Sequence, residues 1–354
     1  TGTGRMENPG ENAGVLFFTL LVFQCNSKAL RRLLMPEPIV GLHHVTAIAS
    51  DPQRNLDFYT ELLGLRLVKR TVNFDDPGTY HFYFGDDAGS PGTLITFFPW
   101  PHVSRGSCGV GETSATAFSV AEGSLEYWEK RLLGAGIPVE SAAERFGKRV
   151  LSFTDADGMK LELIGDVPGD APKPVRQSEV PAAHGIHGFS GVTLCEAGFD
   201  LTANVLEKMG YAQSESDGNR YRFTSTATTG DGLANYIDIL VQTELSYGRM
   251  GAGTVHHIAF RAPDDTGQLE WREELKELKL NVTPVLDRTY FHSIYFREPG
   301  GVLFEIATDP PGFAFDESPE TLGEALKLPP WLESRRNVIE NLVPPITLHT
   351  QKAV

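Results

Sequence analysis

The chain has 354 residues, of which 41% are hydrophobic and 22% are charged, and its formal net charge is −15. This composition predicts a globular protein with one large or two ordinary domains. Nucleic acids and anionic membranes are bound through clustered cations, so the acidic balance and the scattered Lys and Arg exclude both as expected partners. The three cysteines have no motif spacing, and we expect a reducing cytoplasm.

Residues 1–34 do not match the rest of the chain. Their apolar run, residues 14–23, is shorter than the ~20 residues that span a bilayer. It also lacks the basic segment and the small-residue cleavage site of a signal peptide. We therefore interpret Met35 as a natural start and residues 1–34 as an N-terminal extension that is not native. The alternative is an amphipathic helix that docks on the body of the protein or on a partner.

The chain after Met35 repeats one pattern four times, strand–helix–strand–strand–strand, with a period of roughly 60 to 75 residues. The first unit contains a strand at 43–49, a helix at 52–63 and strands near 65–71, 80–84 and 93–98. Asp51 and Pro52 are typical of a helix start, and Gly64 is typical of a helix end. Strand segments alternate apolar and polar residues, which predicts an α+β fold.

The other three units follow the same order. The second unit (about 113–166) has a helix at 124–134 and strands at 149–154 and 159–164; the third (about 187–243) has a helix at 200–209 and strands at 220–224 and 235–241; the fourth (about 254–309) has a helix at 265–279 and strands at 282–287, 293–297 and 302–308. The polar stretch 167–186, which contains four prolines, is the expected linker between two pairs of units, 35–166 and 187–313. Residues 314–354 form a C-terminal extension with predicted helices at 319–327 and 330–341.

Two His-His dipeptides open apolar strands in the first and last units, and in each copy an aspartate follows the second histidine by seven residues. The residues of this repeated feature are His43, His44 and Asp51 in the first unit, and His256, His257 and Asp264 in the fourth. The coincidence of His44 and His257 at one position of the repeat favours a shared role over two unrelated histidines.

A carboxylate near the C-terminal end completes a metal-ligand set. Glu305 lies in the apolar strand 302–306, where an unpaired charge is costly, so Glu305 requires a cation or a proton. Two imidazoles and one carboxylate are the ligands of non-haem Fe(II) oxygenases. We therefore predict that His44, His257 and Glu305 bind Fe(II), with Mn(II) as the alternative ion. This prediction requires the first and last units to meet, within one chain or across a dimer.

The repeat, the two histidines and Glu305 resemble the vicinal oxygen chelate superfamily, which includes glyoxalase I, bleomycin-resistance proteins and extradiol dioxygenases. Residues 71–81 (TVNFDDPGTYH), 95–100 (ITFFPW) and 307–313 (ATDPPGF) are similar to ring-cleaving dioxygenases linked to hydroquinone and quinone stress. The resemblance covers residues 39 to about 345. It implies four βαβββ units that form two half-barrel-like clefts, with one ligand position on the first strand and one on the last strand of each unit.

The middle units do not supply a metal-ligand set. Their last strands carry Glu162 and Asp238, and their first-strand positions fall near Ser114 or Thr116 and near Ser190. We expect these units to pair into a cleft without metal. In that cleft Glu162 would pair with a nearby base such as Lys160 or Arg149.

The same two units that carry the predicted ligands also contain candidate catalytic residues. Tyr295 lies ten residues before Glu305, and the resemblance implies that it hydrogen-bonds substrate. His292 and His81 are candidates for the acid–base group, since imidazole titrates near neutral pH. By strand alternation His292 faces away from Tyr295, so it fits only if the strand begins after it. The aromatic residues that could line a substrate pocket are Phe97, Phe98, Trp100, Tyr290 and Phe291.

The sequence thus predicts a non-haem Fe(II)-dependent dioxygenase that uses O2 to cleave a catechol- or hydroquinone-like aromatic ring. A glyoxalase-like lyase or isomerase is one alternative. It would normally use four protein ligands, and Thr96 at the fourth position disfavours it. A non-catalytic quinone- or drug-binding resistance protein is the other alternative. The roles of His43 and His256 stay open between support of the ligands and simple packing, and edge strands leave a homodimer open.

Overall fold

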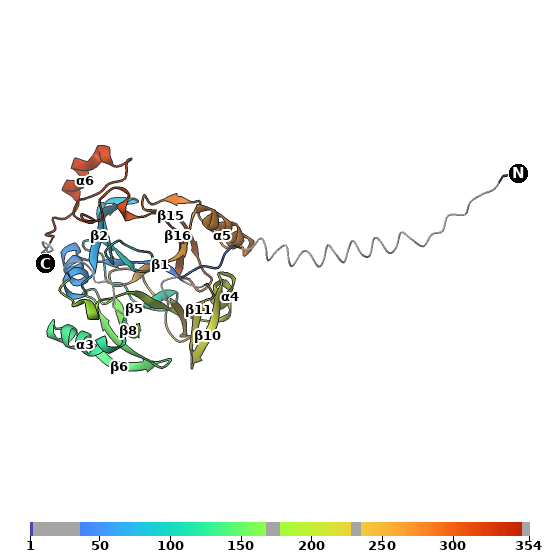
Figure 1. Cartoon of the computed structure of the whole chain (residues 1–354), viewed down its shortest axis with the longest axis horizontal. Helices are drawn as coiled ribbons and strands as arrows, with labels where there is room; N and C mark the ends of the chain where they lie inside the picture. Colours follow the sequence, from blue (N-terminus) through green and yellow to red (C-terminus); the bar gives the residue numbers. More distant parts are fainter. Residues whose placement is uncertain (3–35, 168–177, 228–234, 349–354) are drawn as a thin grey trace. The chain divides into compact units, whose positions relative to one another are not determined.

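In the computed structural model, strand-rich units follow one another from residue 36 and pair into two large sheets (Figure 1). The structure describes residues 1–2, 36–167, 178–227 and 235–348. Residues 3–34 of the predicted N-terminal extension, its predicted boundary at Met35 and most of the predicted linker lie outside these residues.

The four βαβββ units predicted from the sequence are present. The first contains β1 (Leu42–Ala49), α2 (Pro52–Asp57), the π-helix η1 (Phe58–Leu62), β2 (Arg66–Asn73), β3 (Asp76–Gly85) and β4 (Leu94–Pro99). The second contains β5 (Glu112–Ala121), η2 (Glu122–Ser124), α3 (Leu125–Gly134), β6 (Val139–Arg145), β7 (Lys148–Thr154) and β8 (Lys160–Val167). The third, after η3 (Ala182–His184), contains β9 (Gly188–Glu196), α4 (Asp200–Lys208), β10 (Tyr211–Asp217), β11 (Arg220–Ser225) and β12 (Tyr236–Val241). The fourth contains β13 (Val255–Ala262), α5 (Asp265–Glu277), β14 (Leu286–Asp287), β15 (Phe291–Arg297) and β16 (Leu303–Pro311).

The predicted start of the first helix is confirmed, because the Asp51 side chain accepts a hydrogen bond from the Arg54 amide at 2.8 Å. The predicted pattern includes β6 and β10, but the sequence analysis gave neither strand a residue range. The described side chains of both strands lie mostly outside the core, so these strands lack the apolar alternation of the others.

The C-terminal extension contains η4 (Phe313–Phe315), η5 (Glu333–Arg335) and α6 (Arg336–Leu342). The helix predicted at 319–327 is wrong, because this segment forms turns and runs along the edge strand β2. The Lys327 amide donates to the Arg70 carbonyl at 2.9 Å, and Leu326 forms a bridge with Arg70. These contacts cover an edge strand that would otherwise expose unpaired backbone groups.

The first and last units share one eight-stranded sheet, in the order β14-β15-β16-β13-β1-β4-β3-β2. The middle units share the other, in the order β10-β11-β12-β9-β5-β8-β7-β6. In the centre of the first sheet β1 and β13 are antiparallel, with Thr46 opposite His257 and His44 opposite Ala259. Each sheet therefore takes strands from both halves of the chain. The division of the chain into two pairs of consecutive units, 35–166 and 187–313, stays a prediction.

Strand alternation separates the core side of the first sheet from the side that carries the candidate ligands. On β15, Ile294 and Phe296 belong to the main hydrophobic core, whereas Ser293 and Tyr295 face the other side. Phe97 also belongs to this core and stacks near Tyr59, so it is wrong as a pocket residue. The sheet thus leaves one face for polar side chains.

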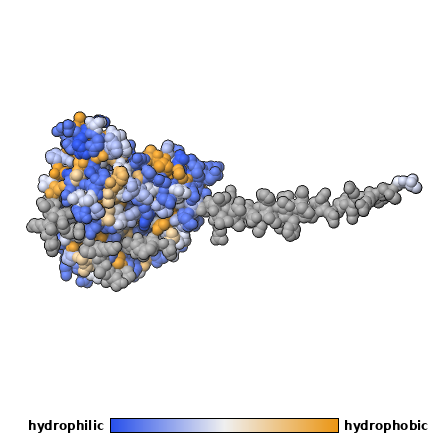
Figure 2. All heavy atoms as spheres, turned by 45° about the horizontal axis from the view of Figure 1, so that its top comes forward, coloured by the Kyte–Doolittle hydropathy of each residue, from blue (hydrophilic) through white to orange (hydrophobic). Residues whose placement is uncertain are grey.

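Among the described residues, none of the helices has both the length and the apolar character needed to cross a bilayer. The face drawn in Figure 2 is mostly hydrophilic, with hydrophobic residues scattered between the polar ones.

Candidate metal centre

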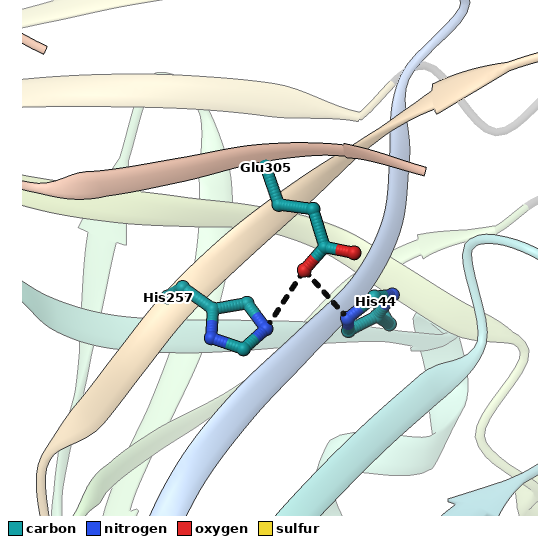
Figure 3. Close-up of side chains that lie close together, drawn as sticks. All are labelled: His44, His257 and Glu305. Carbon is teal, nitrogen blue, oxygen red and sulfur yellow. Dashed lines mark ion pairs between the residues drawn. The ribbon is translucent and has the colours of Figure 1, made fainter. Parts of the chain in front are cut away.

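Three side chains from three adjacent strands converge on one point of the first sheet (Figure 3). His44 comes from β1, His257 from β13 and Glu305 from β16, and their ligand atoms all lie within 4.8 Å of one another. Glu305 Oε2 lies 2.9 Å from His257 Nε2 and 3.3 Å from His44 Nε2. The structure therefore brings together all three predicted ligands within one chain.

The electrostatics of these side chains suit a cation. All three side chains are buried, and Glu305 is 0% exposed. Burial raises the pKa of Glu305, but His44 and His257 outweigh this effect and hold the pKa well below its usual range. Burial lowers the pKa of His257, which favours the neutral imidazole that binds metals. Glu305 Oε2 has no hydrogen-bond donor, so a buried carboxylate oxygen and two imidazole nitrogens face a common point.

Each ligand histidine is held by the histidine before it. Nδ1 of His44 lies 2.9 Å from Nδ1 of His43, and Nδ1 of His257 lies 2.7 Å from Nδ1 of His256. In each pair one nitrogen donates and the other accepts, because two lone pairs cannot face each other. When Nδ1 of His44 and of His257 is the donor, the Nε2 atom of each ring keeps a free lone pair that faces Glu305 and can bind a cation. Hydrogen bonds of this kind orient metal-binding imidazoles, so His43 and His256 lie where they could support the candidate ligands.

Thr96 occupies the fourth possible ligand position, on the last strand of the first unit. Its hydroxyl lies 2.8 Å from the Thr46 hydroxyl and 3.0 Å from His81 Nε2. The other ring nitrogen of His81 lies 2.9 Å from the Tyr83 hydroxyl. Burial and then the neighbouring His44 lower the pKa of His81 well below its usual range. His81 is thus a neutral imidazole beside the three ligands, with both nitrogens in hydrogen bonds.

Tyr295 lies directly opposite Glu305 in the sheet, and its ring is 5.6 Å from that of His257. Its hydroxyl accepts a hydrogen bond from Arg288 Nε at 3.2 Å. Arg288 was not predicted, because it follows β14 in a segment without a periodic signal. Ser293 was not predicted either, although strand alternation places it on the same face as Tyr295.

His292 does not reach the candidate metal centre. Strand β15 begins before it, at Phe291, and Phe291 packs 5.0 Å from the His44 ring. His292 therefore points to the other face, where its Nδ1 lies 2.6 Å from an Asp265 oxygen on α5. The acid–base role predicted for His292 is therefore wrong, because its side chain faces away from the candidate metal ligands.

The second sheet places other residue types at the positions of the ligands. In the first sheet Glu305 pairs with Ala259, which lies two residues after His257. In the second sheet Glu162 pairs with Ala117, so the residue equivalent to His257 is Ala115, two residues before Ala117. In the third unit Asp238 pairs with Thr193, so the equivalent residue is Gly191, two residues before Thr193. The positions predicted at Ser114 or Thr116 and near Ser190 are thus off by one residue. A Cβ atom on Gly191 would lie 2.5 Å from the Tyr236 ring, so that ring fills the space of the missing side chain.

Arginines neutralise the two carboxylates of the second sheet. Arg145 donates to both oxygens of Glu162 at 2.7 and 2.9 Å, and Arg222 donates to both oxygens of Asp238 at 2.7 and 3.0 Å. The pairing predicted between Glu162 and Lys160 or Arg149 is wrong, because Arg145 on the neighbouring hairpin strand reaches it first. Bidentate guanidinium pairs here take the place that a cation would have.

Known proteins resemble this chain in sequence and in fold. The family model described as "Glyoxalase/Bleomycin resistance protein/Dioxygenase superfamily" matches residues 41–163 and 197–306. "Putative ring-cleaving dioxygenase MhqO" of Bacillus subtilis is 48% identical over 86% of this chain and 96% of its own length. "Chlorohydroquinone/hydroquinone 1,2-dioxygenase" of Sphingobium indicum is 34% identical over 84% of this chain and 94% of its own. The crystal structure of a "putative dioxygenase from Bacillus subtilis" superposes with a TM-score of 0.84 at 46% identity, covering 88% of this chain and 99% of that one.

Proposed function

The chain belongs to the glyoxalase/bleomycin resistance protein/dioxygenase superfamily, and from this premise we propose that it is a metal-dependent dioxygenase that cleaves the ring of a hydroquinone-like or catechol-like aromatic. The observation that carries the proposal is the convergence of His44, His257 and Glu305 on one buried point. The names of the relatives support the reaction and the substrate class.

We assign Fe(II) as the working ion, with Mn(II) as the alternative. Two neutral imidazole nitrogens and one orphaned carboxylate oxygen fit either ion, and the set of one carboxylate and two histidines favours iron. The bound ion would orient substrate and O2 side by side and act as Lewis acid and electron conduit.

Half-buried polar side chains around the triad would bind and orient the aromatic substrate. Arg288 Nε–H donates to the Tyr295 hydroxyl, so the proton of that hydroxyl is free to point to a substrate oxygen. Burial and then Glu305 raise the pKa of Tyr295, which keeps the hydroxyl protonated as a donor. Both nitrogens of His81 already have hydrogen-bond partners, so His81 can take a substrate proton only if one contact breaks. We therefore place the main proton donor at Tyr295.

Apolar contacts complete the proposed substrate site. Phe98 stacks 4.3 Å from the His81 ring and packs near His256, and Trp100 extends this surface at 5.2 Å from Phe98. Flat aromatic side chains beside a polar centre suit an aromatic ring that carries hydroxyl groups. Of the pocket residues predicted from the sequence, Phe98, Trp100 and Phe291 therefore remain. Tyr290 is buried and its hydroxyl donates to Asp316 in the C-terminal extension, so we leave it out of the proposed site.

The experiment that tests the proposal is anaerobic reconstitution with Fe(II), followed by metal analysis and oxygen uptake with a panel of hydroquinones and catechols. We expect about one iron per chain and diol-dependent oxygen uptake in the wild type. His257→Ala and Glu305→Gln should lose both. Glu162→Gln changes the corresponding carboxylate of the other sheet and is the matched control, which should keep its iron.

Two outcomes would contradict the proposal. Bound metal without oxygen uptake, but with turnover of a hemithioacetal, would favour a glyoxalase-like isomerase. Failure of the freshly reconstituted wild type to bind Fe(II) or Mn(II) would favour a non-catalytic quinone- or drug-binding protein.

A further inference from the structure

Ser293 makes the two oxygens of Glu305 unequal. Its side chain is 0% exposed, and its hydroxyl donates to Glu305 Oε1 at 2.5 Å. The other oxygen, Oε2, receives no such bond and faces the two imidazoles at 2.9 and 3.3 Å. A single hydroxyl thus divides the carboxylate into an occupied oxygen and a free one.

This division has a consequence for metal binding. A carboxylate oxygen that accepts a short hydrogen bond is turned away from the point where the imidazoles converge, so one oxygen alone can bind an ion there. We propose that Ser293 is a positioning residue that keeps Glu305 monodentate and so preserves one coordination position for substrate or O2. The inference rests on the proposed function, since it needs a metal at this centre.

The second sheet supplies an internal comparison. Glu305 lies opposite Tyr295, and Ser293 lies two residues before Tyr295. In the second sheet Glu162 lies opposite Ser152, so the residue equivalent to Ser293 is Val150. Val150 is buried in a hydrophobic cluster and has no hydroxyl to offer. Arg145 donates to both oxygens of Glu162. The Ser152 hydroxyl does reach Glu162 Oε1, but at 3.4 Å, and this long contact leaves both oxygens to Arg145, whereas the contact between Ser293 and Glu305 is 2.5 Å.

A serine that only satisfied a buried carboxylate would stabilise the fold without setting the number of open coordination positions. The two roles differ in the number of water molecules on a bound ion. With three protein ligand atoms, a six-coordinate ion keeps about three exchangeable positions, and a bidentate carboxylate would reduce them to about two.

The experiment uses Mn(II) as the probe, loaded anaerobically into the wild type and the Ser293→Ala, Ser293→Cys and Ser293→Thr variants. Bound water is counted from the broadening of the Mn(II) resonance in ¹⁷O-enriched water, and the Mn(II) Kd is measured in the same samples. We expect Ser293→Ala to lose about one water and to change the Kd by about 10-fold or more. Ser293→Thr, which keeps a hydroxyl, should restore the wild-type count, and Ser293→Cys, a weak donor, should fall between them.

Ser152→Ala, on the corresponding face of the other sheet, is the control and should change neither quantity. An unchanged water count in Ser293→Ala with Mn(II) bound would overturn the positioning role and leave the proposed function intact. A wild type that binds no Mn(II) and no Fe(II) would overturn the proposed function itself, and the role of Ser293 with it. Cys and Thr variants keep the comparison available if Ser293→Ala does not fold.

Discussion

Arg288 donates to Asp75 Oδ2 at 3.2 Å, and this contact joins the two outer edges of the sheet that carries the candidate metal ligands. Arg288 follows β14, which is one edge of that sheet, and Asp75 follows β2, which is the other. The same guanidinium donates to the Tyr295 hydroxyl. The ion pair therefore closes the curved sheet and holds Arg288 where it can orient Tyr295.

Replacing Asp75 by Asn should weaken this closure only slightly. The Asp75 side chain is 77% exposed, and exposed ion pairs contribute less than about 1 kcal/mol. We expect Asp75→Asn to raise the KM for hydroquinone by less than about 5-fold while kcat and iron content stay unchanged. Steady-state kinetics test this, and 1 M NaCl should produce the same change in the wild type by screening the pair. An equal fall in kcat and iron content would contradict it.

Tyr295→Phe should separate catalysis from metal binding. The substitution removes the hydroxyl that Arg288 orients, and it leaves His44, His257 and Glu305 in place. Loss of a positioned proton donor costs about 100-fold or more, so we expect kcat to fall by that factor with the iron content unchanged. His81→Asn is the comparison, and it should reduce kcat less, because both nitrogens of His81 are bound within the protein. A larger loss in His81→Asn at full iron content would assign the proton to His81 instead.

The convergence of the three candidate ligands could be predicted from the sequence because a repeated unit places equivalent residues at equivalent positions. His44 and His257 share one position of the repeat, and a buried Glu305 needs a partner, so chemistry and periodicity agreed. Arg288 and Asp75 could not be predicted, since they meet only because the sheet curves until its two edges approach each other. Contacts of that kind depend on strand twist and closure rather than on any local pattern.

The errors in the second sheet have a local cause. The register between β5 and β9 shifts between Thr113 and Ala115, so an irregularity in the pairing changes which residues face the cleft. Shifts of the same kind occur between β1 and β13, but there the histidines mark the position, and the second sheet has no such residue to mark it. The partner of Glu162 was missed for a related reason, since Arg145 lies on β6, a strand without a clear apolar pattern.

Lys69 should anchor the C-terminal extension against the first sheet. This lysine is 0% exposed, lies 2.7 Å from an Asp316 oxygen and also pairs with Glu317, and its ammonium sits 4.8 Å from the centre of the Tyr290 ring. Removing one partner of a buried ionic group leaves uncompensated charge and costs about 3 kcal/mol or more. We expect Lys69→Met to lower the Tm by about 5–10 °C.

Thermal unfolding of Lys69→Met beside Lys160→Met provides the check. Lys160 pairs with Glu140 on the surface, where both side chains are largely exposed, so its loss should change stability by no more than about 0.5 kcal/mol. Equal Tm values for the two variants would show that the buried cluster contributes nothing.

Glu196 should make stability depend on pH between the acid range and about pH 8. Its side chain is 0% exposed, neither carboxyl oxygen has a hydrogen-bond donor, and it lies against Gly300 beside the buried Glu298. Burial and then the charge of Glu298 raise the pKa of Glu196 to about 8. The Glu298 carboxylate itself accepts hydrogen bonds from Thr202 and from the amides of Gly300 and Val302.

The direction of the effect follows from proton binding. An unfolded glutamate loses its proton near pH 4.3, so between that pH and about 8 the folded chain holds one proton more at Glu196 than the unfolded chain. The stabilising contribution is complete below the unfolded pKa, and stability falls as pH rises, by at most about 1.4 kcal/mol per pH unit, until the folded pKa is passed. Glu196→Gln cannot ionise and should lose this slope. Urea unfolding of both proteins at pH 5 to 9 measures it, because the other titrating groups cancel in the difference between the two free energies of unfolding. Glu140→Gln, at an exposed position, should run parallel to the wild type, and a parallel curve for Glu196→Gln would show that Glu196 is ionised throughout.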